Sequence, residues 1–198
     1  DNLDTDKVLS CLRTDCPYEL YWYEKTANTE WSYNYSVSVS GGKRIVRITD
    51  LEVSMPVCNG YASDQYRVDA SMVNIAKASA ANAKQIVNEF KNSSVTEKLV
   101  AYKEMICYLT DYNDEAMSDS YADGYGDPWQ LIWVFDGDDS TQVVCEGYSK
   151  AFQYLCDLSD STCYTVTGDM DGGTGAGPHM WNLSHIHISE PTRRVVIS

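Results

Sequence analysis

Apolar and polar residues alternate along two neighbouring segments in the first third of the chain. In segments 32–39 and 44–51 roughly every second residue is apolar, which is the period of a β-strand with one buried face. Gly41 and Gly42 stand between the two segments, so the pattern predicts a β-hairpin. A further strand is expected over 51–57. We therefore predict a β-rich region over residues 1–68 that packs on the core.

Two shorter segments precede the hairpin. Residues 4–14 have a short apolar face and are predicted to form a helix that ends before Pro17. The aromatic run 18–23 is predicted to be a strand or an edge segment. Its rings are expected to pack in the core, and an aromatic platform for a substrate is the alternative.

The hydrophobic period lengthens to three or four residues after residue 69, which indicates helices. Helices are predicted over about 73–90 and 97–109, with Asp69 or Ser71 capping the first and Thr96 the second. A third stripe runs over 145–158. Strands are predicted over 161–167 and 179–183, on either side of a Gly-rich loop. The mixture predicts an α+β fold whose core spans residues 69–184.

Composition narrows the classes of protein to consider. The 198 residues are enough for one domain, and the net charge of −14 argues against binding to nucleic acid or to an anionic membrane surface. No apolar stretch is long enough for a transmembrane helix. The acidic composition suits a secreted or surface-exposed protein. Because the chain begins with Asp1 and shows no signal peptide, we expect a processed or fragmentary N-terminus.

Two polar stretches could suggest ligand sites. The acidic segment 111–127 raises the possibility of calcium, but its spacing does not match an EF-hand, and a solvated loop is expected with no metal. The Gly-rich loop 171–177 lacks the helix and Lys of a phosphate-binding loop. We expect this loop to be a mobile flap, and no cofactor is predicted.

The cysteines leave the redox compartment open. There are seven, an odd number, and no Cys-x-x-Cys motif is present. Cys156 and Cys163 flank a helix-to-strand turn and could pair. Cys107 lies among apolar residues of a predicted helix, and we expect it to be a buried thiol.

Cys145 begins the third predicted helix and is the first candidate for chemistry. Free backbone N–H groups and the positive end of the helix dipole favour a thiolate at that position. The neighbouring Glu146 opposes a thiolate, so its carboxylate is expected to point away from the sulfur. The alternative is a buried structural thiol.

His179 begins a predicted strand and is the second candidate. The succession of helix, strand, loop and strand would return His179 to the start of the helix, within reach of Cys145 as a base. The alternative is a strand histidine with a structural partner. Trp181 is expected to pack under the imidazole. Asn182 could orient the imidazole, but its spacing from His179 puts the two side chains on opposite faces of a strand.

Three runs of sequence surround these candidates: CEGYSKAFQYLC at 145–156, CYTVTG at 163–168 and GPHMWN at 177–182. Together they resemble the transglutaminase-like superfamily of papain-type thiol enzymes, and more narrowly its bacterial cell-surface members from Firmicutes. The resemblance is strongest over 125–183. It implies a papain-like arrangement in which a catalytic Cys at a helix N-terminus packs on an antiparallel sheet that carries the His.

The resemblance also implies a triad of Cys145 as nucleophile, His179 as base and acid, and an Asp on the next strand. No Asp follows Asp171 in this chain. The segment HIHISEPTR resembles a translated sequencing adapter, so residues 185–198 are expected to be a non-native tail on a truncated gene. We therefore do not expect His185 and His187 to bind metal. Loss of the orienting Asp predicts weak activity or none.

An oxyanion donor is needed besides the backbone N–H of the nucleophile, and the resemblance implies an aromatic N–H or O–H. Trp129, Gln130 and Trp133 are candidates by residue type, and core packing is the alternative for each. The predicted function is thiol-dependent acyl transfer on protein or peptide amides, as in a transglutaminase, a cysteine peptidase or an amidase. The alternative is a non-catalytic cell-surface binding or adhesion module. We expect no nucleic-acid partner, no membrane insertion, and a place in a larger multidomain surface protein.

Overall fold

A computed structural model describes residues 4–117, 129–171, 177–185 and 194–197. Helices and small, mostly antiparallel sheets are combined in one α+β fold, as the sequence predicted. None of the helices in these ranges is long and apolar enough to cross a membrane. Residues 118–127 of the acidic segment 111–127, residues 172–176 of the Gly-rich loop 171–177, and His187 lie outside the described residues.

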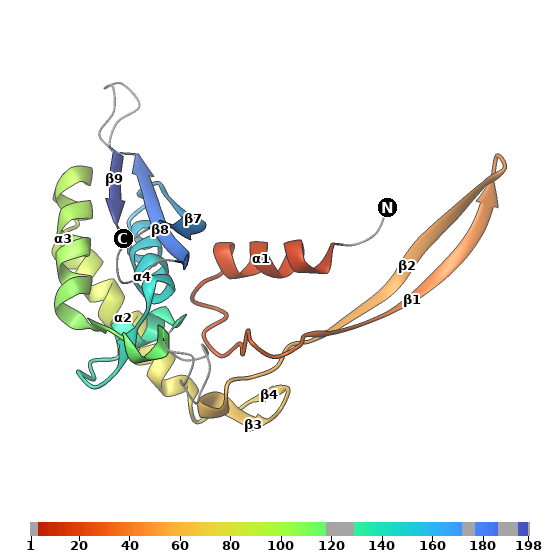
Figure 1. Cartoon of the computed structure of the whole chain (residues 1–198), viewed down its shortest axis with the longest axis horizontal. Helices are drawn as coiled ribbons and strands as arrows, with labels where there is room; N and C mark the ends of the chain where they lie inside the picture. The colour runs from red at the N-terminus through yellow and green to blue at the C-terminus, as the bar shows by residue number, and fades with distance from the viewer. Residues whose placement is uncertain (1–3, 118–128, 172–176, 186–193, 198) are drawn as a thin grey trace.

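Helix α4 (Cys145–Leu158) is the centre of the compact body (Figure 1). Its apolar stripe buries Ala151, Phe152 and Leu155 completely or almost completely, as the spacing predicted. The elements around it are α2 (Val73–Glu89), α3 (Val95–Leu109), the 3₁₀ turn η4 (Leu131–Val134), and strands β7 (Cys163–Met170) and β8 (Gly177–His185).

A three-stranded antiparallel sheet, β7-β8-β9, packs on α4. Strand β9 (Arg194–Ile197) pairs with β8, and β7 pairs with β8 so that Gly168 lies opposite His179. The buried Asn182 donates a hydrogen bond of 2.9 Å to the Ser149 carbonyl of α4, and the Ser149 hydroxyl donates to the Met180 carbonyl at 3.0 Å. Asn182 therefore fastens β8 to the helix.

The two helices before α4 begin close to the predicted positions but with different caps. Ser94, rather than Thr96, caps α3, and it forms a capping box with Glu97. Helix α2 begins after Met72, and no side chain of the described residues caps it. Cys107 on α3 is exposed, so the expectation of a buried thiol was wrong; it lies on the side of the helix away from the core.

The N-terminal segment contributes one helix and an aromatic turn. Helix α1 (Thr5–Asp15) is capped by Asp4 and ends before Pro17, as predicted. The aromatic run 18–23 forms turns instead of a strand, apart from a single bridge between Tyr23 and Val57. Tyr21 and Tyr23 are buried, which confirms the expected core packing of these rings.

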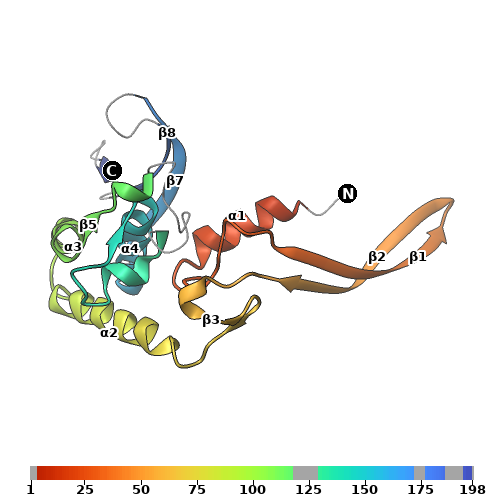
Figure 2. The same ribbon diagram turned by 60° about the horizontal axis from the view of Figure 1, so that its bottom comes forward.

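The predicted hairpin is present as β1 (Glu30–Ser40) and β2 (Lys43–Ser54), and it extends far from the body (Figures 1 and 2). Almost every residue of both strands is exposed. The hairpin thus departs from the expectation that all of residues 1–68 pack on the core. No separate strand covers 51–57, because β2 continues to Ser54. Short elements follow: η1 (Asn59–Tyr61), β3 (Ala62–Asp64) and β4 (Arg67–Val68).

Candidate active site

Cys145 is the first residue of α4, so its thiol lies beside the backbone N–H groups of the first helical turn. Strand β6 (Gln142–Val143) leads into the helix through Val144, whose backbone is extended, and no described side chain caps this helix end. The turn is tight: a Cβ on Gly147 would lie 2.6 Å from the Cβ of Val143. Glycine at this position therefore lets the strand feed directly into the helix.

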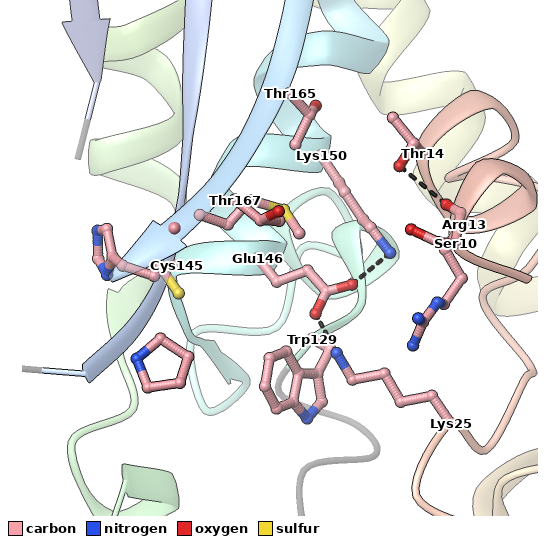
Figure 3. Close-up of a pocket in the computed structure, with 14 residues that line it drawn as sticks. Ser10, Arg13, Thr14, Lys25, Trp129, Cys145, Glu146, Lys150, Thr165 and Thr167 are labelled. Atoms are coloured by element: carbon pink, nitrogen blue, oxygen red, sulfur yellow. Dashed lines mark hydrogen bonds and ion pairs between the residues drawn. The ribbon is translucent and has the colours of Figure 1, made fainter. Parts of the chain in front are cut away.

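Cys145 and His179 line the same cavity, which has a volume of about 220 Å³. Helix α1 forms one wall, the first turns of α4 form another, and β7 and β8 form a third. Cys145 lies at one side of the cavity and a group of charged side chains lies at the other (Figure 3). The side chains from outside α4 and the sheet that line it are Ser10, Arg13, Thr14, Lys25 and Trp129.

His179 lies near the start of β8, the middle strand of the sheet, and lines the cavity. Its ring stacks on Trp181 with 6.1 Å between centroids and 25° between planes, which confirms the expected contact. The Nε2 atom of His179 is buried and has no hydrogen-bond partner among the described residues. Among the hydrogen bonds of the described residues, none joins His179 to Cys145. An acceptor or donor for Nε2 would have to come from a substrate, from the thiol or from a further residue.

Asn182 does not orient the imidazole. It lies an odd number of residues from His179 on the same strand, and its amide is engaged with Ser149 on α4 at 2.9 Å. The opposite-face placement expected from the sequence is confirmed by this contact.

Tyr112 is a neighbour of Cys145 that comes from another strand. Strand β5 (Asp111–Tyr112) pairs in parallel with β6, so that Tyr112 lies opposite Val143. Its ring also stacks on Tyr148, with 6.1 Å between centroids. Burial raises the pKa of Tyr112, the charge of a Cys145 thiolate raises it further, and the backbone amide of Cys145 acts in the opposite sense. The phenol therefore stays protonated near neutral pH and can donate a hydrogen bond beside the thiol.

The three proposed oxyanion donors have different surroundings. The Nε1 of Trp133 donates to the Tyr61 hydroxyl at 3.0 Å, and the Nε2 of Gln130 donates to the Cys58 sulfur at 3.4 Å. Both side chains are therefore engaged away from Cys145. Trp129 does line the cavity, but its ring lies under the ammonium of Lys25, with Nζ 3.1 Å from the ring centroid.

A buried ionic cluster occupies the side of the cavity away from the thiol. The Glu146 carboxylate forms ion pairs with Lys25 and with Lys150, the second at 2.6 Å. Figure 3 shows the carboxylate turned from the Cys145 sulfur toward these two amines, as the sequence predicted. One carboxylate thus holds two ammonium groups in a site with little solvent.

The protonation behaviour of the cluster follows from burial and charge. Burial lowers the pKa of Lys25 to about 8; Glu146 opposes this, while Lys150 and Arg13 add to it. For Glu146, burial alone would raise the pKa, but the two lysines outweigh it and the pKa lies below its ordinary value. Glu146 is therefore ionised at neutral pH, and the cavity holds more positive than negative charge.

The sequence did not single out Arg13, Lys25, Lys150 or Tyr112. Only the contact of Lys150 with Glu146 could be expected from the sequence, because Lys150 stands four residues after Glu146 on a predicted helix. Arg13 and Lys25 come from the N-terminal segment, and nothing local indicates which helix they will face. In the described ranges no group of three or more His, Cys, Asp or Glu side chains could hold a metal ion.

Comparison of the sequence with protein-family models found no match, and comparison with curated proteins found none.

Proposed function

We propose that the chain derives from a transglutaminase-like cysteine enzyme that transfers acyl groups from protein or peptide amides. Cys145 is the nucleophile and His179 is the base and acid. The observation that carries the proposal is that these two residues, far apart in the sequence, line one cavity at the uncapped start of α4. A helix start of this kind favours a thiolate, and a papain-like arrangement of helix and sheet would account for the meeting of the two side chains.

The reaction would proceed in two steps. The Cys145 thiolate attacks the amide carbonyl and forms a C–S bond; the C–N bond then breaks as His179 gives its proton to the leaving nitrogen. Water or an amine next attacks the thioester carbonyl and loses a proton to His179; a C–O or C–N bond forms, the C–S bond breaks, and Cys145 leaves as the thiolate. The backbone N–H of Cys145 and the hydroxyl of Tyr112 would hold the oxyanion, since Tyr112 keeps its proton.

The unpartnered Nε2 of His179 favours a second candidate function. Because no carboxylate of the described residues orients the imidazole, the fold could serve as a non-catalytic binding or adhesion module. We propose a secreted or cell-surface location for either form, on the acidic composition and the resemblance together, and a place in a larger multidomain protein.

Alkylation of Cys145 separates the two functions. At about pH 6, where an ordinary thiol with a pKa near 8.5 is almost wholly protonated, we expect iodoacetamide to modify Cys145 roughly tenfold or more faster than it modifies a free thiol. Peptide mapping by mass spectrometry measures each site in the same sample. The exposed Cys11 and Cys107 are internal references.

Two variants complete the alkylation experiment. Cys145→Ser should abolish the fast phase, and His179→Ala should slow it because the imidazole no longer stabilises the thiolate. If Cys145 instead reacts no faster than Cys11 and Cys107, the enzyme proposal fails and the binding module is favoured.

A further inference from the structure

One side of the cavity beside Cys145 is lined by cationic side chains that take no part in the acyl-transfer step. Three basic side chains enter it from different elements: Arg13 from the last turn of α1, Lys25 from the turn before β1, and Lys150 from α4. Figure 3 shows all three directed toward Glu146. They lie together although the chain as a whole has a net charge of −14.

The charges in this cluster do not balance. Glu146 is ion-paired with both lysines, while Arg13 makes no ion pair with any described residue. Its charge is nevertheless close enough to lower the pKa of Lys25, together with that of Lys150. An additional anion would reduce the mutual repulsion of these three cations, and the planar guanidinium of Arg13 suits a carboxylate in particular.

The position of the cluster ties it to the thiol. Glu146 follows Cys145 directly in α4, and both residues line the same cavity as the three basic side chains. Helix α1 is held against α4 at this point by a hydrogen bond of 3.1 Å from the Gln153 amide to the Thr14 carbonyl. Arg13, one residue before Thr14, is therefore carried by an anchored helix end.

We propose that the Arg13, Lys25 and Lys150 side of this cavity is a carboxylate-binding subsite, and that the ligand of the Cys145 pocket carries a carboxylate close to the amide. Arg13 is the direct partner, and Glu146 holds the two lysines in place. That the ligand is an acyl donor rests on the proposed function; that it is anionic does not. The carboxylate can come from an acidic side chain or from a free peptide C-terminus.

Binding to the Cys145→Ser variant tests the subsite without chemistry. The probes are short acetylated peptides: one with a Glu and an amidated C-terminus, the same peptide with Gln, and the Gln peptide with a free C-terminal carboxylate. Titration calorimetry measures their affinities. We expect the Glu peptide, the free-carboxylate peptide or both to bind about tenfold more tightly than the neutral one, as a hydrogen bond between charged groups provides. The peptide that gains identifies the source of the carboxylate.

Variants of Arg13 distinguish recognition from a structural role. In the Cys145→Ser background, Arg13→Gln should remove most of the preference for the anionic peptide and leave the affinity for the neutral peptide unchanged. Arg13→Lys should keep part of the preference, because it keeps the charge but loses the fork. Arg67→Gln, an exposed arginine paired with Asp64, is the matched control and should change nothing.

Three results would overturn the subsite: equal affinities for charged and neutral peptides, no measurable binding of any peptide at millimolar concentration, or an equal loss for both classes in Arg13→Gln. The outcome is independent of turnover. Discrimination by a chain whose Cys145 alkylates like a free thiol would keep the subsite and reject the enzyme. Fast alkylation without discrimination would do the reverse.

Discussion

Glu146 is the residue on which the charge arrangement of the cavity depends. Its carboxylate is shared by two ammonium groups, and all three side chains are largely shielded from water. Two buried cations can lie near each other only because this anion is between them. Glu146 also follows Cys145 directly at the start of α4. The carboxylate next to the thiol in the sequence is therefore already ion-paired with Lys25 and Lys150.

Lys25 gives this cluster a measurable pH dependence. Its pKa is about 8 in the folded chain and near 10.5 when unfolded. Between these values the unfolded state binds more protons, so the contribution of Lys25 to the free energy of unfolding rises with pH from about 8 to about 10. Urea unfolding of the wild type and of Lys25→Met across this range measures the effect, because titrating groups that do not interact with Lys25 cancel in the difference. A difference that stays flat or falls would show that Lys25 titrates normally.

At the scale of elements, helix α4 has contrasting ends. Its start is left open beside Cys145, whereas its end is closed by the backbone: Ser161 N–H donates to the Cys156 carbonyl at 2.8 Å, and Asp160 N–H donates to the Asp157 carbonyl at 3.3 Å. Asp160 occupies the left-handed position of this motif, with φ of 52°. Helices that end in this motif usually place glycine there, because a Cβ is unfavourable in that conformation.

Asp160→Gly should therefore stabilise the chain by about 0.5–1 kcal/mol, observed as a higher midpoint of urea unfolding. Asp160→Ala is the matched variant, since it also removes the carboxylate but keeps the Cβ. We expect it to be no more stable than the wild type. Equal gains from both variants would assign the effect to the lost charge and not to the backbone.

Regular elements could be predicted from the sequence because each has a period of its own. The hairpin, α1 to α4, β7 and β8 all follow alternation or helical spacing, although the cap of α3 is Ser94 and not the predicted Thr96. Strands β5 and β6 have two residues each and no period. Their pairing is what brings Tyr112 to Cys145, so that neighbour could not be predicted.

The candidate site likewise contains some residues that the sequence predicted and others that it did not. Cys145 and His179 were visible because helix and strand periods begin at them and because the surrounding motifs resemble a family. The cationic wall depends on where α1 and the turn carrying Lys25 settle against α4, which is decided by long-range packing and by contacts such as that between Gln153 and Thr14. The local pattern of apolar and polar residues does not indicate such contacts.

At the scale of the whole molecule, the β1–β2 hairpin presents one apolar face to solvent. Tyr33 and Tyr35 are in contact on that face, and Tyr33 is 60% exposed. Register places further apolar pairs beside them, including Val37 opposite Val46. Ser36 and Arg47 form a pair on the other face. An exposed apolar strand pair of this length is prone to association with other chains.

Val37→Glu should reduce self-association at high protein concentration, as measured by light scattering, without lowering the unfolding midpoint, because Val37 packs on nothing in the body. Ser36→Glu makes the same change of charge on the neighbouring residue of the polar face and should have a much smaller effect. If both variants behave alike, net charge and not the apolar face controls association.

The hairpin also leaves and rejoins the body at one place, since Glu30 lies opposite Ser54. A short turn could bridge these two positions in place of the intervening residues, and the walls around Cys145 would keep every contact described above. The arm is in this sense a removable extension. Its length and side chains could therefore be altered without changing the lining of the pocket, which comes from other elements.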